Sequence, residues 1–188
     1  MFHFFIRFNG VNSFAQTSFL AESGVAVFCP ADMDSARTLP SMALVKNLQP
    51  QGSVHVNWKI TPVFSKVNGK STVTITYDVD ADLYGNGEVT GSLRRNNTNV
   101  TLWNTDNYLY TSVDNGKRLY QSHPWVMGVR KDGTAFGIIA DNSWKQYFDL
   151  SNPLTITSEG PAFRVIIIEK QNPMEVQKTL AELTGKMN

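Results

Sequence analysis

The chain has 188 residues, of which 41% are hydrophobic and 18% charged, and 17 Lys and Arg nearly balance 16 Asp and Glu. This length fits one domain with a substantial core, and the net charge of +1 indicates no basic surface for nucleic acid or an acidic membrane. One cysteine and three dispersed histidines exclude an intrachain disulfide and offer no ligand set at metal-site spacing, so we expect neither a metal nor a cofactor.

Residues 1–23 match no recognisable pattern and are predicted to form an N-terminal extension. Their apolar part, residues 1–8, is interrupted by His3 and Arg7 and is much shorter than the roughly 20 apolar residues of a membrane-spanning helix. Residues 2–15 lack the positive n-region of a secretion signal. We therefore predict no membrane association, and the sequence leaves the compartment open.

Apolar and polar residues alternate in residues 53–60 and 71–79, which is typical of strands with one buried face. Between these segments lies Asn68-Gly69, a pair that supplies the positive φ angles of a tight turn. The pattern predicts a hairpin that pairs residues 54–64 with residues 72–79.

A second hairpin is predicted further along the chain. Residues 124–130 and 134–140 are strongly apolar, and Asp132-Gly133 lies in the turn between them. This apolar composition predicts a central position in a sheet.

Residues 144–150, 154–158 and 162–169 continue the strand pattern, and residues 164–168 are apolar enough for burial on both faces. Residues 31–52, with Pro30 just before them and Pro40 and Pro50 within them, are predicted to be an irregular connection. Many strands without intervening helices predict an all-β fold, a β-sandwich.

The chain is predicted to end in one short helix. Asn172 suits the N-cap, Pro173 the first turn and Gly185 the C-terminus, with apolar residues at 174, 176, 180 and 183 between them. We expect this helix to pack against a following domain and to expose an apolar patch in the isolated chain.

Three glycines in residues 82–91 do not have the dinucleotide-binding spacing, so a bent strand and loop is expected there. Residues 100–108 and 119–125 concentrate aromatic, amide and carboxylate groups. Such groups suit sugars, because rings stack on C–H faces while amides and carboxylates bind hydroxyls. The alternative is that Trp103, Tyr108 and Trp125 only fill the core.

Six motifs follow one another in the chain: LYGNGEVTG (83–91), LWNTDNY (102–108), LYQSHPW (119–125), DGTAFG (132–137), SEGP (158–161) and LAELTG (180–185). In this order they resemble the N-terminal domain of family 31 glycoside hydrolases. The resemblance covers residues 24–188 and implies a single galactose-mutarotase-like β-sandwich, or supersandwich, that precedes a (β/α)8 catalytic barrel. One departure is Asn86, where the family often has a small residue.

The resemblance also implies a site. In that family a loop of this domain reaches the mouth of the barrel, so Asp106 would hydrogen-bond hydroxyls of an α-linked glucoside, while Trp103, Asn104 and Tyr108 would support or line the pocket. Asn107 and Tyr110 would be further companions. The family's two catalytic aspartates lie on the barrel, so we expect no catalytic residue here and no hydrolysis by the isolated chain.

Two alternatives remain open at this point. An aldose epimerase would need a His acid and a Glu base, yet His55 and His123 are interpreted as structural. A stand-alone carbohydrate-binding module would use the same aromatic loop without chemistry.

Overall fold

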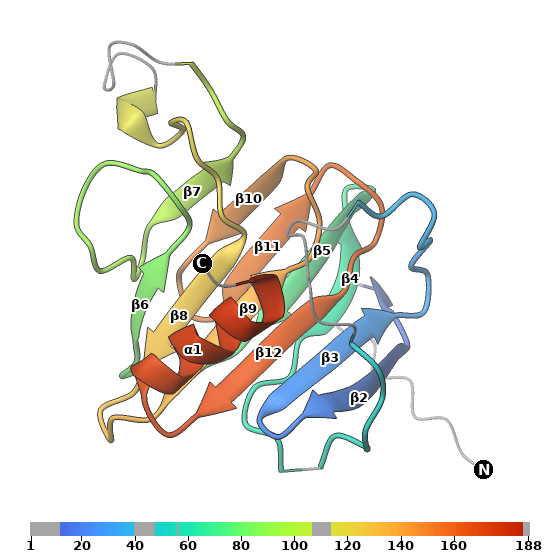
Figure 1. Ribbon diagram of the computed structural model, residues 1–188. Coiled ribbons are helices and arrows are strands. Elements are labelled where there is room, and N and C mark those ends of the chain that lie inside the picture. The colour runs from blue at the N-terminus through green and yellow to red at the C-terminus, as the bar shows by residue number, and fades with distance from the viewer. Residues whose placement is uncertain (1–11, 40–47, 56, 107–113, 186–188) are drawn as a thin grey trace.

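The computed structural model describes residues 12–39, 48–55, 57–106 and 114–185, which form two six-stranded antiparallel sheets and one helix (Figure 1). This confirms the predicted β-sandwich with a short C-terminal helix. The first sheet has the order β1 (Asn12–Ser13), β4 (Val63–Val67), β5 (Lys70–Ile75), β11 (Leu154–Ser158), β10 (Gln146–Asp149) and β7 (Asn99–Leu102). The second has the order β2 (Gln16–Glu22), β3 (Val25–Pro30), β12 (Val165–Lys170), β9 (Ala135–Ala140), β8 (Trp125–Val129) and β6 (Asp82–Gly85).

Residues 165–168 of β12, in the second sheet, are buried on both faces of the strand, as their apolar run predicts. Val165 and Ile167 join the core between the sheets, where they meet residues of the first sheet such as Ile156. Ile166 and Ile168 point to the opposite face and join a second apolar cluster under the helix. The period of two in a strand therefore distributes one continuous apolar run between two cores.

The helix α1 (Pro173–Thr184) covers the outer face of the second sheet, where it contacts β12, β9 and β8 (Figure 1). Its buried residues are Val176, Thr179 and Leu183. The expected exposed apolar patch is therefore largely absent from this helix, because its own sheet covers most of the apolar face, while packing against a following domain stays a prediction. Met174, which is 77% exposed, is an exception.

The predicted caps of α1 are confirmed. Asn172 accepts a hydrogen bond from the backbone N–H of Glu175 at 2.9 Å, and its amide donates to the Glu175 carboxylate at 3.0 Å. The backbone N–H of Gly185, at φ 104°, donates to the carbonyl of Ala181. Both ends of the helix are thus closed by local contacts that need no partner.

We expect Asn172→Ala to lower the free energy of unfolding by about 1 kcal/mol, because it leaves the first turn of α1 without its side-chain acceptor. Urea unfolding followed by circular dichroism measures the effect. Asn172→Ser, which keeps an acceptor, should lose much less. Equal losses in the two variants would contradict a capping role.

Both predicted hairpins are present, but the first has different boundaries. β4 and β5 meet at the predicted Asn68-Gly69 turn, where φ is 51° and 79°. The first strand starts at Val63 rather than at residue 54, because Pro62 has no N–H for the ladder. The structure describes no strand at residues 53–55 and 57–60, where the sequence alternates, and Ile60 is buried.

The second hairpin, β8–β9, lies inside the second sheet as predicted, with its turn at residues 131–133. β10, β11 and β12 confirm the three predicted later strands, with shorter bounds for β10 and β12. The division of the chain near residue 23 stays a prediction. Within the described residues, β2 is hydrogen-bonded to β3.

The glycine-rich segment forms a strand, β6, followed by a loop, as expected. Two hydrogen bonds hold this loop against the start of β8 and the segment that leads into it. The Asn86 N–H donates to the Trp125 carbonyl, and the Glu88 N–H donates to the Gln121 carbonyl, both at 2.9 Å. A side chain at Gly87 would place its Cβ 2.5 Å from the Gln121 oxygen. Two of the sequence motifs are thereby held side by side.

Candidate functional site

The predicted site residues follow β7, an edge strand of the first sheet. Val100 and Leu102 point into the core, whereas Trp103 is 51% exposed and Asn104 and Asp106 are exposed. The segment is held by a 2.9 Å hydrogen bond from the Thr105 N–H to the Leu119 carbonyl. The structure therefore presents these side chains to solvent instead of using them as core.

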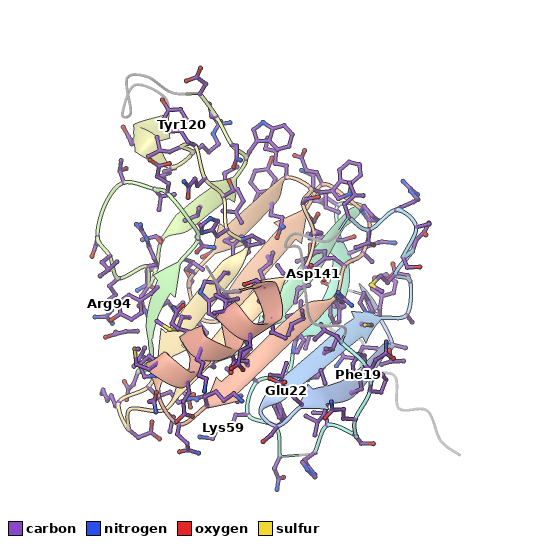
Figure 2. The ribbon with its side chains drawn as sticks, in the orientation of Figure 1. Phe19, Glu22, Lys59, Arg94, Tyr120 and Asp141 are labelled. Carbon is purple, nitrogen blue, oxygen red and sulfur yellow. The ribbon has the colours of Figure 1, made fainter. Side chains whose placement is uncertain are left out.

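The remaining predicted members of the site, Tyr108 with Asn107 and Tyr110, lie outside the described residues. The chain resumes with a short 3-10 turn, η1 (Asp114–Gly116), at the same end of the molecule as the end of β7 (Figure 1). Tyr120, 40% exposed, lies at this end too (Figure 2). This end thus displays several exposed aromatic side chains.

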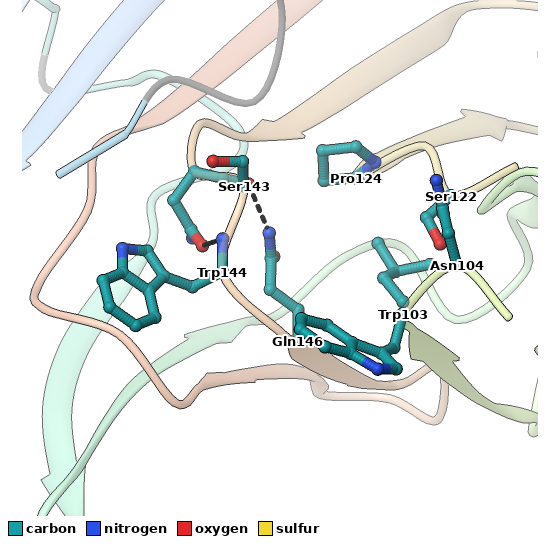
Figure 3. A pocket seen from close by; sticks show the side chains of 9 residues that line it. Trp103, Asn104, Ser122, Pro124, Ser143, Trp144 and Gln146 are labelled. Carbon is teal, nitrogen blue, oxygen red and sulfur yellow. Dashed lines mark hydrogen bonds between the residues drawn. The ribbon is translucent and has the colours of Figure 1, made fainter.

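A cavity of about 360 Å³ opens beside Trp103. Figure 3 shows the Gln146 side chain between the indoles of Trp103 and Trp144, with Ser122 and Pro124 across from them. The lining residues come from the end of β7, the segment that leads into β8, and the connection from β9 to the start of β10. It consists of Leu102, Trp103, Asn104, Ser122, Pro124, Asn142, Ser143, Trp144 and Gln146.

Two buried amides form the floor of the cavity. Gln146 Nε2 donates to the Asn142 carbonyl at 2.7 Å, and Asn142 Oδ1 accepts from the Trp144 N–H at 3.0 Å. The neighbouring Asp141, 1% exposed and labelled in Figure 2, is paired with Arg164 at 2.6 Å. The connection from β9 to β10 is consequently fixed by hydrogen bonds and one ion pair.

The comparisons with known proteins agree with this architecture. Residues 23–149 match the family model described as glycosyl hydrolase 31 N-terminal galactose mutarotase-like domain. This chain belongs to that family.

The relatives of this family 31 domain are much longer proteins. It is 37% identical over 107 residues to alpha-glucosidase 2 of Bacillus thermoamyloliquefaciens, which covers 55% of this chain and 13% of the relative. It is 25% identical over 128 residues to an alpha-xylosidase of Emericella nidulans, covering 66% of this chain and 15% of the relative. The chain therefore spans less than a fifth of these curated relatives.

Solved structures give the same picture. A family 31 alpha-glucosidase from Bacteroides thetaiotaomicron is 55% identical over 57% of this chain and 18% of its own, with a TM-score of 0.52. A GH31 dextranase of Flavobacterium johnsoniae shares the fold at 18% identity, with a TM-score of 0.70 over 94% of this chain and 28% of its own. The chain is thus the N-terminal domain type of family 31 glycosidases, which act in carbohydrate metabolism.

Acidic groups of this family 31 domain are dispersed. Glu88 accepts from the Tyr120 N–H at 3.2 Å, and Glu159 accepts from the Tyr147 hydroxyl at 2.6 Å. The Tyr147 hydroxyl lowers the pKa of Glu159.

His55 and His123 are both exposed. Across the ranges that the structure describes, no three His, Cys, Asp or Glu side chains are grouped to hold a metal ion. Within the same ranges no helix is long and apolar enough to cross a membrane.

The sequence predicts Trp103 and Asn104 as site residues, but it does not predict the residues of the opposite wall of the cavity. Trp144 and Gln146 lie in the predicted strand of residues 144–150, and Asn142 belongs to no predicted element, and nothing in their local pattern distinguishes a cavity from a core. The available signal was the presence of two amides and an indole in one short turn, residues 142–146. Only the pairing of β10 with β7 brings this turn beside Trp103.

Proposed function

We propose that this domain is part of an α-glucosidase-type hydrolase in which residues 103–106 contribute to the sugar-binding pocket. The observation that carries the proposal is the exposure of Trp103, Asn104 and Asp106 directly after a strand whose other large side chains are buried. A carboxylate and an amide beside an indole supply the acceptors, donors and ring face that a hexose requires. Relatives named alpha-glucosidase support the substrate class.

The proposed partner is a catalytic (β/α)8 barrel of the same polypeptide, packed against the end that carries residues 103–106. Retaining hydrolysis needs two carboxyl groups about 5 to 5.5 Å apart, one as nucleophile and one as acid. The described carboxylates do not supply such a pair in the cavity, whose lining residues carry no acidic side chain. Hydrolysis is therefore assigned to the barrel, and the isolated chain is expected to be inactive.

The test compares this chain with a version extended in its native reading frame through the following domain. Release of nitrophenol from p-nitrophenyl α-glucoside measures turnover in both. The proposal predicts no turnover by the short chain and turnover by the long one. Turnover by the short chain alone would mean that its own carboxylates are catalytic, and the proposal would fail.

In the extended protein we expect Asp106→Ala to lower kcat/KM about 10- to 100-fold. The reason is that a hydrogen bond to a charged group contributes about 1.5 to 3 kcal/mol, and about 1.4 kcal/mol corresponds to a factor of ten. Asp80→Ala is a matched control, because Asp80 is an exposed aspartate that pairs only at the surface with Lys131. An equal effect of both substitutions would show that Asp106 has no specific role.

A further inference from the structure

The cavity beside Trp103 has two aromatic walls that face solvent. Trp103 and Trp144 are 51% and 41% exposed, although tryptophan side chains are usually well buried. Figure 3 shows their indoles on either side of Gln146. Two exposed ring faces flanking one hollow are suited to a ligand with apolar C–H faces.

The floor of the cavity carries an unused donor and an unused acceptor. Asn142 and Gln146 are each 1% exposed, yet among the described residues Asn142 Nδ2 and Gln146 Oε1 have no hydrogen-bond partner. A buried polar atom without a partner is costly, and such atoms often indicate a missing ligand or water. A hydroxyl group suits either atom, since it can both donate and accept.

The opposite amide atoms are already engaged, which excludes a simple exchange of the two ends. Gln146 Nε2 donates to the Asn142 carbonyl, and Asn142 Oδ1 accepts from the Trp144 N–H. Both residues line the cavity, so a ligand bound there lies next to both amides. The exposed Asn104 and Ser143 add polar groups at the rim.

We infer that this cavity is a carbohydrate subsite, in which Asn142 and Gln146 bind hydroxyl groups of one sugar ring between Trp103 and Trp144. Its volume of about 360 Å³ lies at the small end of the range of ligand sites, about 300 to 1,000 Å³. The class of ligand, a sugar, rests on the proposed function, whereas the position of the subsite rests on the cavity itself. It adds the turn of residues 142–146 to the sugar-contacting surface.

The position of Trp144 is built into the fold. A Cβ on Gly160 would lie 2.2 Å from Trp144 Cγ, so the indole lies directly against the backbone of Gly160. Gly160 N–H in turn donates to the hydroxyl of Ser158 at 3.0 Å. Gly160→Ala would therefore displace the indole without removing any polar group of the subsite.

The four tryptophans of the chain allow a direct test. The four indole N–H signals of the 15N-labelled chain, assigned with single Trp→Phe variants, are followed during titration with methyl α-glucoside and with maltose. We expect the signals of Trp103 and Trp144 to shift with saturation, and those of Trp58 and Trp125 to stay unchanged, because Trp125 is buried and Trp58 lines a different cavity. Glycerol, which has hydroxyls but no ring, should cause no saturable shift.

Variants separate the walls from the floor. Trp144→Ala, Trp103→Ala and Gly160→Ala should each weaken binding about tenfold through loss of stacking. Gln146→Leu, which keeps the size but removes the acceptor, should weaken it about three- to tenfold. Trp58→Phe is the control that should leave the Kd unchanged, and circular dichroism confirms that each variant is folded.

Absence of a saturable shift at Trp103 and Trp144 up to about 100 mM sugar would overturn the inference, since even weak subsites saturate near that range. Loss of binding in the chain extended through the barrel would overturn it as well and would indicate a protein-docking surface. The proposed function is tested separately, because the effect of Asp106→Ala on turnover does not depend on sugar binding by the short chain.

Discussion

Gly137→Val is expected to lower the free energy of unfolding by about 3 kcal/mol, the upper end of the usual cost of overpacking a core. An ideal Cβ at this position lies 2.1 Å from the indole of Trp125, which crosses over Gly137 from the neighbouring strand β8. The indole is 7% exposed and packs in the cluster beneath α1, so it has little space to move. Chemical denaturation followed by circular dichroism measures the loss.

Gly133 provides the control, because its backbone conformation and not a lack of space favours glycine there. Gly133 has φ 84° in the β8–β9 turn, and a Cβ there would meet nothing within 4 Å. Gly133→Ala should therefore cost only the backbone strain, about 1 kcal/mol. Shortening the indole in Trp125→Leu should reduce the effect of Gly137→Val, and additive losses would refute the steric explanation.

The second large effect is expected at Arg130, whose variant Arg130→Met should lose about 3 to 5 kcal/mol at about pH 8. The guanidinium is 6% exposed and contacts both carboxylate oxygens of Glu169 at 3.0 Å, while its Nε donates to Asp78. Removing it leaves the carboxylate of Glu169, which is 16% exposed, without its buried partner. The loss comes from that uncompensated charge more than from the missing contacts.

The loss should also depend on pH. Burial raises the pKa of Glu169 in the folded chain, and Arg130 opposes this shift. A carboxyl whose pKa rises on folding contributes stability below its unfolded pKa, about 4.5, and loses that contribution as the pH rises through the folded pKa. Arg130→Met raises the folded pKa further, so the difference from wild type should grow between about pH 5 and about pH 8.

The double variant Arg130→Met, Glu169→Leu distinguishes the two sources of the loss. It replaces the ion pair with apolar side chains of similar size and should recover a large part of the stability lost by Arg130→Met. Its remaining loss should vary little with pH, because the buried carboxyl is gone. A single variant as stable as wild type at about pH 8 would contradict the buried-charge explanation.

These two positions also connect the fold to the site. Gly137 and Arg130 fix the β8–β9 hairpin. The segment that leads into β8 contains Ser122 and Pro124, which line the cavity. The start of β8 and this segment also hold the loop after β6, through the backbone hydrogen bonds of Asn86 and Glu88. A rigid hairpin thus positions several motifs that are far apart in the sequence.

Much of the fold follows from the sequence alone, because its causes are local. Apolar patterns marked β4, β5 and β8 to β12 but not β2 and β3, Asn68-Gly69 and Asp132-Gly133 marked the turns, and Asn172 marked the start of α1. Each of these signals acts over a few residues, through side-chain direction, φ preference or a cap. The motif order identified the family, and the exposure of Trp103, Asn104 and Asp106 was consistent with it.

What only the tertiary structure decided depends on contacts between distant segments. The burial of the helix face against β8, β9 and β12 and the place of Trp144 opposite Trp103 are set by contacts across long stretches of chain. Trp144 and Gln146 look like ordinary strand residues until the pairing of β10 with β7 brings them to the cavity beside Trp103. Local patterns specify which face of a strand is apolar, but the partner that covers that face is chosen by the packing of the whole sandwich.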